Sequence, residues 1–146
     1  MNALGPEQYR ALVELAPAML WRAGRDGGRD YFNATWLAYT GRALREELGD
    51  GWMRGVHPDD VDRCRARYLD AFERRQTFAL EFRLRRHDGT YRHVVDRGVP
   101  HEDADGTFAG FVGSCTEAEN HLRGSAPEAV ELFEMSLDNL CVAGFD

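Results

Sequence analysis

The chain has 146 residues, 43% of them hydrophobic, and a formal net charge of −7. This length and composition fit one domain with a real core and exclude wholesale disorder. The negative charge argues against nucleic acid as a partner, because phosphate binding needs a concentrated basic face. No run approaches the ~18 apolar residues of a membrane helix, and no signal peptide is recognisable. The three cysteines form no C-x-x-C motif, so we expect a reduced, cytoplasmic protein with no membrane contact within these residues.

Hydrophobic periodicity and turn residues predict the elements along the chain. The pattern indicates helices over 6–16, 34–39, 42–48 and 58–76, and strands over 18–23, 29–33, 77–86, 90–100 and 108–115. Asn33 suits a helix N-cap, Gly41 a helix end, and Pro58 a first helical position. The order is two strands, several short helices, one longer helix and three strands. It predicts an α+β domain with a single sheet and the helices gathered on one side.

The hairpin over 77–100 organises the rest of the chain. Apolar residues alternate before Asp88-Gly89, which supplies the positive φ angles of a tight turn, and a second turn is expected at Asp105-Gly106. Five arginines lie along the two strands. Because charged residues are usually exposed to solvent, they predict a solvated sheet face: Arg83, Arg85, Arg86, Arg92 and Arg97.

Several short motifs resemble a PAS domain with its C-terminal PAC segment, as in bacterial multi-PAS signalling proteins. They cover roughly residues 12–119 in the right order and are Tyr31–Trp36, Thr40-Gly41, Gly51-Trp52, Val56–Asp60, Glu81–Gly89, Tyr91-Arg92, Arg97-Gly98, Asp105-Gly106 and Gly110–Cys115. The resemblance implies a five-stranded antiparallel sheet with short helices packed on one face. It also implies a sensory or dimerising module that is not itself an enzyme, although a parent chain could be a histidine kinase or a diguanylate cyclase.

The chain departs from the family pattern at two places. The Asp-Ile/Val-Thr junction that commonly couples the last strand to an output helix corresponds here to Glu117, Ala118 and Glu119, which keeps an acid and loses the Thr. His93 stands where an aromatic residue such as Trp is frequent. The usual signal-transfer contact is therefore in doubt.

The resemblance also divides the chain. We expect an N-terminal helix over 1–16, a PAS/PAC domain over 17–119, a linker over 120–127, and the truncated start of a second PAS-like domain over 128–146. The N-terminal helix, with Leu12 and Val13 on one face, is the expected surface for a homodimer.

Seven apolar residues are the candidates for lining a ligand pocket between sheet and helices: Trp36, Trp52, Met53, Phe72, Phe82, Val94 and Phe111. The simpler interpretation, which we favour, is that they fill the core without a ligand. No convergent acid–base or nucleophilic set indicates catalysis, so no catalytic residue is assigned.

The cofactor, if there is one, is not identified by the sequence. The Asn-Cys-Arg-Phe signature of photoreactive flavin domains is missing, and no His falls within the longer helix, where haem-binding relatives often carry one. His57 precedes that helix and is better explained as part of its start. The stretch His101–Gly106 partly mimics a calcium loop, but Val112 stands where its last Glu should be, so a hairpin turn is favoured and no metal site is assigned.

Two functional hypotheses stand at this point. The first is a cytoplasmic sensory module, ligand-binding or dimerising, that serves as the input domain of a sensor histidine kinase or cyclic-dinucleotide signalling protein. The second is a purely structural dimerisation module with no ligand.

Overall fold

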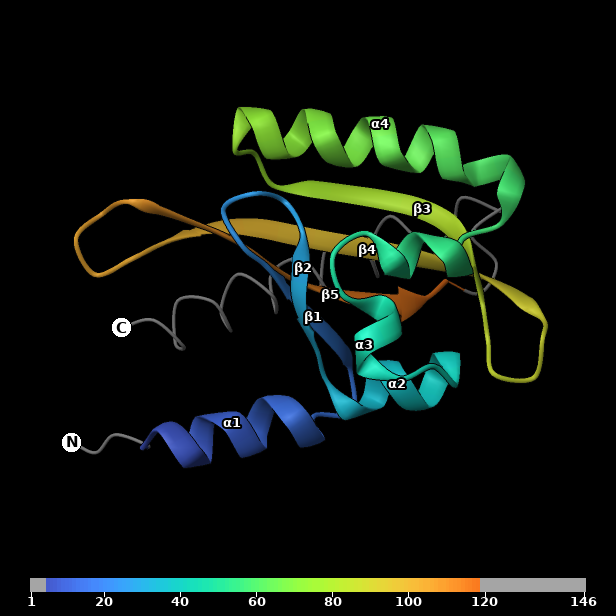
Figure 1. Cartoon of the computed structure of the whole chain (residues 1–146), viewed down its shortest axis with the longest axis horizontal. Coiled ribbons are helices and arrows are strands. Elements are labelled where there is room, and N and C mark those ends of the chain that lie inside the picture. Colours follow the sequence, from blue (N-terminus) through green and yellow to red (C-terminus); the bar gives the residue numbers. More distant parts are fainter. Residues whose placement is uncertain (1–4, 119–146) are drawn as a thin grey trace.

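The computed structural model describes residues 5–118. In chain order the elements are α1 (Pro6–Leu15), β1 (Met19–Ala23), β2 (Arg29–Phe32), α2 (Ala34–Thr40), α3 (Leu44–Glu47), the 3-10 helix η1 (Gly51–Gly55), α4 (Pro58–Arg74), β3 (Phe78–Arg85), β4 (Tyr91–Glu102) and β5 (Phe108–Glu117) (Figure 1). The helices and strands predicted from the sequence are confirmed, with ends that agree within two residues. The prediction for the linker 120–127 and the second domain start 128–146 lies outside the described residues.

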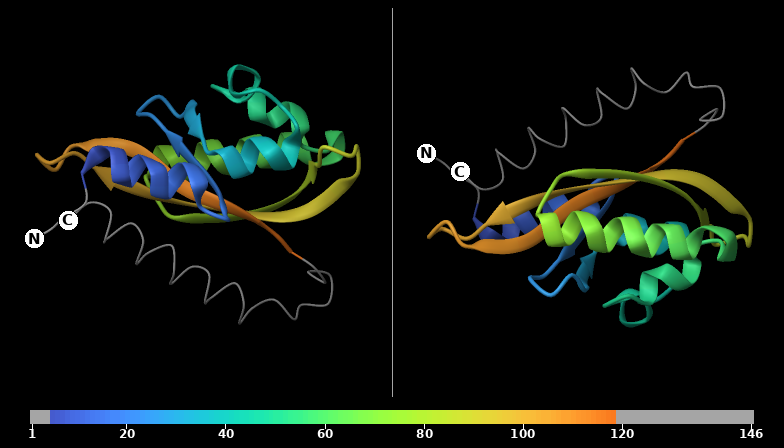
Figure 2. Two further views of the ribbon diagram at one scale, coloured as in Figure 1. Left: turned by 90° about the horizontal axis from the view of Figure 1, so that it is seen from below. Right: turned by 90° about the horizontal axis from the view of Figure 1, so that it is seen from above.

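One five-stranded antiparallel sheet holds the fold together, in the order β2-β1-β5-β4-β3. The predicted α+β fold class is therefore confirmed. Helices α2, α3 and α4 lie on the same face of the sheet (Figure 2). The core lies between that face and the helices, and it contains all the buried aromatic residues of β1, η1 and α4.

Local capping explains where the two main helices begin. The Asn33 side chain accepts a hydrogen bond from Trp36 N at the start of α2, and Gly41 ends that helix at a φ of +71°. At α4, His57 Nδ1 accepts from Asp59 N, and Pro58 occupies the first turn. The interpretation of His57 as part of the helix start is confirmed.

Two Asp-Gly turns join the long strands, as predicted. Gly89 and Gly106 both adopt positive φ angles, and Asp88 and Asp105 each accept a hydrogen bond from the backbone N two residues on. Side-chain bonds of this kind fix a turn locally, which explains why sequence alone locates both hairpins.

Two paired glycines make room in the sheet for a large side chain. Gly98 on β4 pairs with Gly113 on β5. A Cβ at Gly113 would come within 2.3 Å of the Trp21 indole, and one at Gly98 within 2.9 Å of it. Glycine at both positions leaves room for the Trp21 indole beside β4 and β5, where it reaches the polar group described below.

The prediction of a solvated arginine face is wrong at Arg97, whose exposed fraction is 2%. Val95 and Val99, two residues to either side, are also buried. β4 is an interior strand of the sheet, and the side chains of its neighbours β3 and β5 flank Arg97 on both sides, where it pairs with Ala79 and Ser114.

Candidate functional site

A charged pair lies in the core, between the sheet and the helices. Arg29, the first residue of β2, donates from Nη2 to Asp96 Oδ2 on β4 over 2.5 Å, and the exposed fraction of both side chains is 0%. Trp21 Nε1 donates to the other carboxylate oxygen over 2.8 Å. Asp96 therefore has a partner at each oxygen, from two different strands.

Aromatic rings enclose the Arg29 guanidinium group. Its central carbon lies 3.5 Å from the ring centre of Trp21, 3.7 Å from that of Trp52 and 5.0 Å from that of Tyr68. Cation–π attraction at a desolvated site is worth about 2 kcal/mol, which offsets part of the cost of burying the charge. These four residues and Asp96 form what we call the core polar cluster: Trp21, Arg29, Trp52, Tyr68 and Asp96.

The hydrogen-bonding capacity of Arg29 is not exhausted. Its Nε and Nη1 atoms are buried and form no hydrogen bond with any described residue. The nearby Tyr68 hydroxyl donates to the carbonyl of Gly27 over 2.8 Å, and it also interacts with the Arg29 guanidinium and raises the pKa of Arg29, but it is not a hydrogen-bond acceptor for Nε or Nη1 at this geometry. A buried donor without an acceptor costs about 1–3 kcal/mol, so the cluster would gain from an additional acceptor.

Burial and pairing act against each other on the two charges. Burial raises the pKa of Asp96, while Arg29 lowers it, and the net direction is upward. Burial lowers the pKa of Arg29, but the Asp96 carboxylate and Tyr68 raise it, so that the net direction is again upward. Arg29 therefore stays charged, and Asp96 depends on Arg29 for its ionised form.

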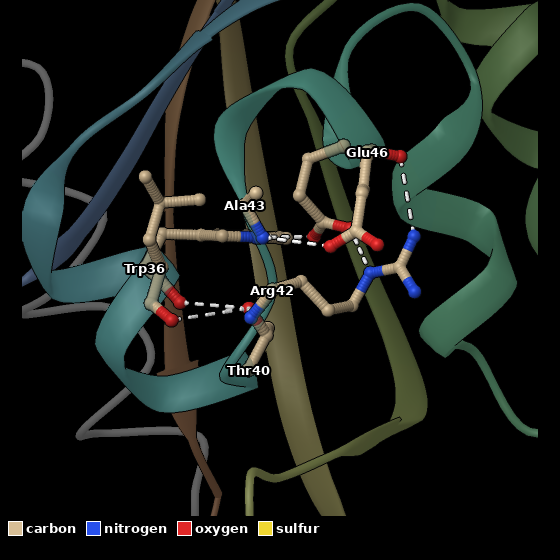
Figure 3. Close-up of polar contacts among 7 residues, drawn as sticks. Trp36, Thr40, Arg42, Ala43 and Glu46 are labelled. Atoms are coloured by element: carbon tan, nitrogen blue, oxygen red, sulfur yellow. Dashed lines mark hydrogen bonds and ion pairs between the residues drawn. The ribbon is translucent and has the colours of Figure 1, made fainter.

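A buried polar contact connects α2 to α3 at the edge of the core. Trp36 Nε1 donates to buried Glu47 over 2.7 Å, and Arg42 Nε bonds the other oxygen of Glu47. Arg42 Nη2 also donates to the Glu46 carbonyl over 3.2 Å. Figure 3 shows this corner, with the Arg42 guanidinium held beside Glu46. The indole of Trp36 is thus fixed by α3.

All seven predicted pocket residues come together in the structure. Six are buried in one hydrophobic cluster, and Phe72, partly buried, packs against it with its ring centre 5.0 Å from that of Phe111. Whether these residues bind a ligand stays a prediction. The sequence analysis named Trp52 as a candidate but did not name Arg29 or Asp96. Asp96 could have been recognised as inward-facing, because it lies two residues after Val94 and therefore on the same face of β4.

The predicted junction residue Glu117 ends β5 and contacts α2, β4 and the β3–β4 turn. Its Oε2 atom accepts from the Tyr39 hydroxyl of α2 over 2.9 Å and lies 3.4 Å from Arg92 Nε and 3.7 Å from Arg86 Nη1. Burial and this hydrogen bond raise the pKa of Tyr39, so the phenol stays protonated and keeps donating. Ala118 N donates to the His93 carbonyl over 2.8 Å, and Glu119 lies outside the described residues.

The core polar cluster and the junction occupy neighbouring positions of one strand pair. Asp96 pairs with Cys115, and Val94 pairs with Glu117, so one two-residue step separates them. A step of two residues in a strand is about 7 Å.

Residues 29–115 match the family described as PAS fold. This chain belongs to the PAS fold family. The PAS domain is 40% identical over 106 residues to the uncharacterized protein y4lL of Sinorhizobium fredii, covering 73% of this chain and 13% of that protein. It is 32% identical over 128 residues to the peroxide stress-activated histidine kinase mak1 of Schizosaccharomyces pombe, covering 82% of this chain and 8% of that one.

A solved structure agrees with this assignment. The sensory box histidine kinase/response regulator from Burkholderia thailandensis is 25% identical, with a TM-score of 0.55, and the match covers 91% of this chain and 99% of that chain. The PAS domain spans only a small part of both curated relatives. Within the described residues, no helix has the length and apolar character needed to cross a membrane.

Proposed function

We propose that this PAS domain is the sensory input module of a larger signalling protein, either a sensor histidine kinase or a cyclic-dinucleotide signalling protein. Similarity to two histidine-kinase proteins supports a sensor histidine kinase as the larger protein. Signalling would be initiated by a small molecule bound at the core polar cluster. The chain itself supplies recognition, and the output chemistry would belong to the parent protein.

The observation that carries the proposal is the pair of unused donors on Arg29. Nε and Nη1 lie on different edges of the guanidinium group, so one ligand oxygen would satisfy one of them and a ligand with two acceptors would be needed to satisfy both. A neutral ligand with a carbonyl, amide or hydroxyl oxygen fits best, because the Arg29–Asp96 pair is already balanced and a further buried charge would be costly. The rings of Trp52 and Phe82, whose centres lie 6.1 Å apart, offer apolar surface beside it.

Occupancy would reach the junction along β4 and β5. A ligand that rotates Arg29 would change its hydrogen bond to Asp96. Asp96 lies one two-residue step from Glu117 on the same strand pair. Glu117 in turn contacts Tyr39, Arg86 and Arg92. A ligand shifts such an equilibrium only by its difference in affinity for the two states.

The test is to denature the purified protein and identify what it releases by mass spectrometry, after recording an absorption spectrum. The wild type should release a small neutral molecule. The double variant Arg29→Met/Asp96→Asn, which keeps an acceptor for Trp21 Nε1, should release none, whereas the exposed-site control Arg67→Met should behave like the wild type. Equal release from both variants would contradict the proposal, and a Soret or flavin band would replace the neutral ligand by a chromophore.

A second candidate function, dimerisation through α1, is favoured by a separate observation. None of the residues of α1 is buried, and the exposed fractions of Leu12 and Leu15 are 58% and 74%. Tyr9 and Val13 are exposed as well. We propose that a second copy of the chain covers this apolar face.

Sedimentation velocity at increasing concentration tests this surface. The wild type should form dimers, and Leu12→Glu/Leu15→Glu should remain monomeric because two carboxylates would be buried in the interface. Leu69→Glu, at an exposed position of α4, is the control and should still dimerise. A wild type that is monomeric at every concentration would remove this second function.

A further inference from the structure

A basic hollow lies away from the core polar cluster, where three segments meet. It has a volume of about 230 Å³ and is lined by Thr40, Gly41, Arg42, Arg54, Gly55, Arg85, Arg86 and His87. These residues come from the end of α2, the end of η1 and the β3–β4 turn. Four of the eight are arginines, and none is acidic.

Backbone contacts hold the three segments in place. His87 N donates to the Tyr39 carbonyl over 2.8 Å, and His57 N donates to the Arg83 carbonyl over 2.9 Å. A Cβ at Gly41 would lie 2.9 Å from the Cβ of His87, so glycine permits this close approach. These backbone contacts therefore fix the positions of the segments that line the hollow.

The four arginines differ in their partners. Arg42 is paired with Glu47, and Arg86 is paired with Asp88 over 2.6 Å and lies near Glu117. Arg54 and Arg85 have no ion pair with any residue of the described range 5–118. Two positive charges are thus left uncompensated at the hollow in a protein whose net charge is −7.

We propose that this hollow binds a small soluble anion bearing a phosphate group. Guanidinium groups match phosphate oxygens with paired hydrogen bonds, and a doubly charged group would balance Arg54 and Arg85. Arg42 keeps Nη1 unbonded within the described residues and adds a further donor. The volume lies below the ~300–1,000 Å³ of pockets for drug-sized ligands, which fits a phosphate group with a short substituent.

This site is independent of the core polar cluster. Its residues lie on loops and element ends, and the proposal holds whether or not a ligand occupies the core. Because Arg86 lies 3.7 Å from Glu117, the bound anion would be adjacent to the junction.

Titration with inorganic phosphate, followed by two-dimensional amide NMR, tests the proposal, with sodium chloride at matched ionic strength as the reference. Phosphate should shift the amide signals of residues 40–42, 54–55 and 85–87 in a saturable manner. Arg54→Gln/Arg85→Gln should weaken binding at least about tenfold, because both uncompensated charges are lost. The charge-matched control Arg10→Gln/Arg67→Gln removes two exposed arginines elsewhere and should bind like the wild type.

Two results would overturn the proposal. One is a response to phosphate no larger than the response to chloride, which would indicate screening alone. The other is equal binding by the two double variants, which would place the anion elsewhere. Neither result bears on the core ligand, because the release experiment uses Arg29 and Asp96.

Discussion

At the residue scale, Asn33 joins three segments through one buried side chain. Its Oδ1 accepts from Leu20 N over 3.0 Å and Trp36 N over 3.1 Å. Its Nδ2 donates to the carbonyls of Val13 over 2.8 Å and Ala18 over 2.9 Å. Every polar site of the amide is used, so Asn33 is more than the helix cap that its position in the sequence indicates.

Substitutions at Asn33 can distinguish its role as a helix cap from its role in joining three segments. Asp is as good an N-cap as Asn, so Asn33→Asp would be nearly neutral if capping were its only role. We expect it instead to cost about 2–4 kcal/mol, at least as much as Asn33→Ala, because a carboxylate would face two carbonyls without donors. Urea unfolding measures this. An Asn33→Asp protein with wild-type stability would contradict the interpretation.

The same scale shows where sequence reasoning stops. The cap bonds of Asn33 and His57 reach backbone within three residues, so the capping roles follow from local sequence, whereas the bonds from Asn33 to Val13, Ala18 and Leu20 do not. Arg29 and Asp96 are 67 positions apart and meet only after the sheet forms. Charged residues are usually exposed, so neither one alone indicates a core position. Alternation along β4 can place Asp96 on the inward face, but periodicity cannot show that Arg29 is its partner.

At the element scale, one carboxylate ties α4 to β3. Asp60, in the first turn of α4, accepts from Arg83 N and Nε, each over 2.9 Å, and from Arg83 Nη2 over 2.8 Å. The hydrogen bonds from Arg83 lower the pKa of Asp60 to about 2, although burial opposes this. This contact fixes the start of the helix that covers the core.

The lowered pKa predicts how Asp60 contributes to stability as pH changes. The contribution is present above the ordinary carboxyl value of 3.8 and is lost as pH falls toward about 2. Near neutral pH, Asp60→Asn should be less stable by about 1–3 kcal/mol, and this difference should shrink across that window. Chemical unfolding at a series of pH values measures it.

The neighbouring residue supplies the control. The Asp59 side chain is 77% exposed, and Asp59→Asn should change the free energy of unfolding by no more than about 0.5 kcal/mol. A difference between Asp60→Asn and wild type that stays constant from neutral pH to pH 2 would show that the carboxylate–Arg83 pair does not act as described.

Elements were predicted well because their signals are local. The alternation Phe78, Leu80, Phe82 and Leu84 gives strand β3, and Asp-Gly turns locate its hairpin partner and β5. The helix η1 was not predicted, because its Gly-Trp-Met-Arg-Gly sequence has no helical periodicity. The burial of Arg97 was not predicted for a different reason: it depends on which strands flank β4 in the sheet.

At the scale of the whole molecule, a buried charge pair lies close along the sheet to the end of the last strand. The pair lies between sheet and helices, and Asp96 is one two-residue step along β4 and β5 from Glu117. Glu117 contacts α2 through Tyr39, β4 through Arg92 and the β3–β4 turn through Arg86. If the proposed signal starts in the core, β4 and β5 offer a path to Glu117 that does not pass through a loop.

Amide hydrogen exchange over residues 108–118, followed by mass spectrometry, tests this link most directly. The comparison is between Arg29→Met/Asp96→Asn, which removes the charge pair, and Cys64→Ala, which opens a cavity in the same core but leaves the pair intact. We expect the first variant to speed exchange at the end of β5 by about tenfold more than elsewhere in the sheet, and Cys64→Ala to affect the sheet evenly. Even acceleration in both variants would contradict the link between the core polar cluster and Glu117.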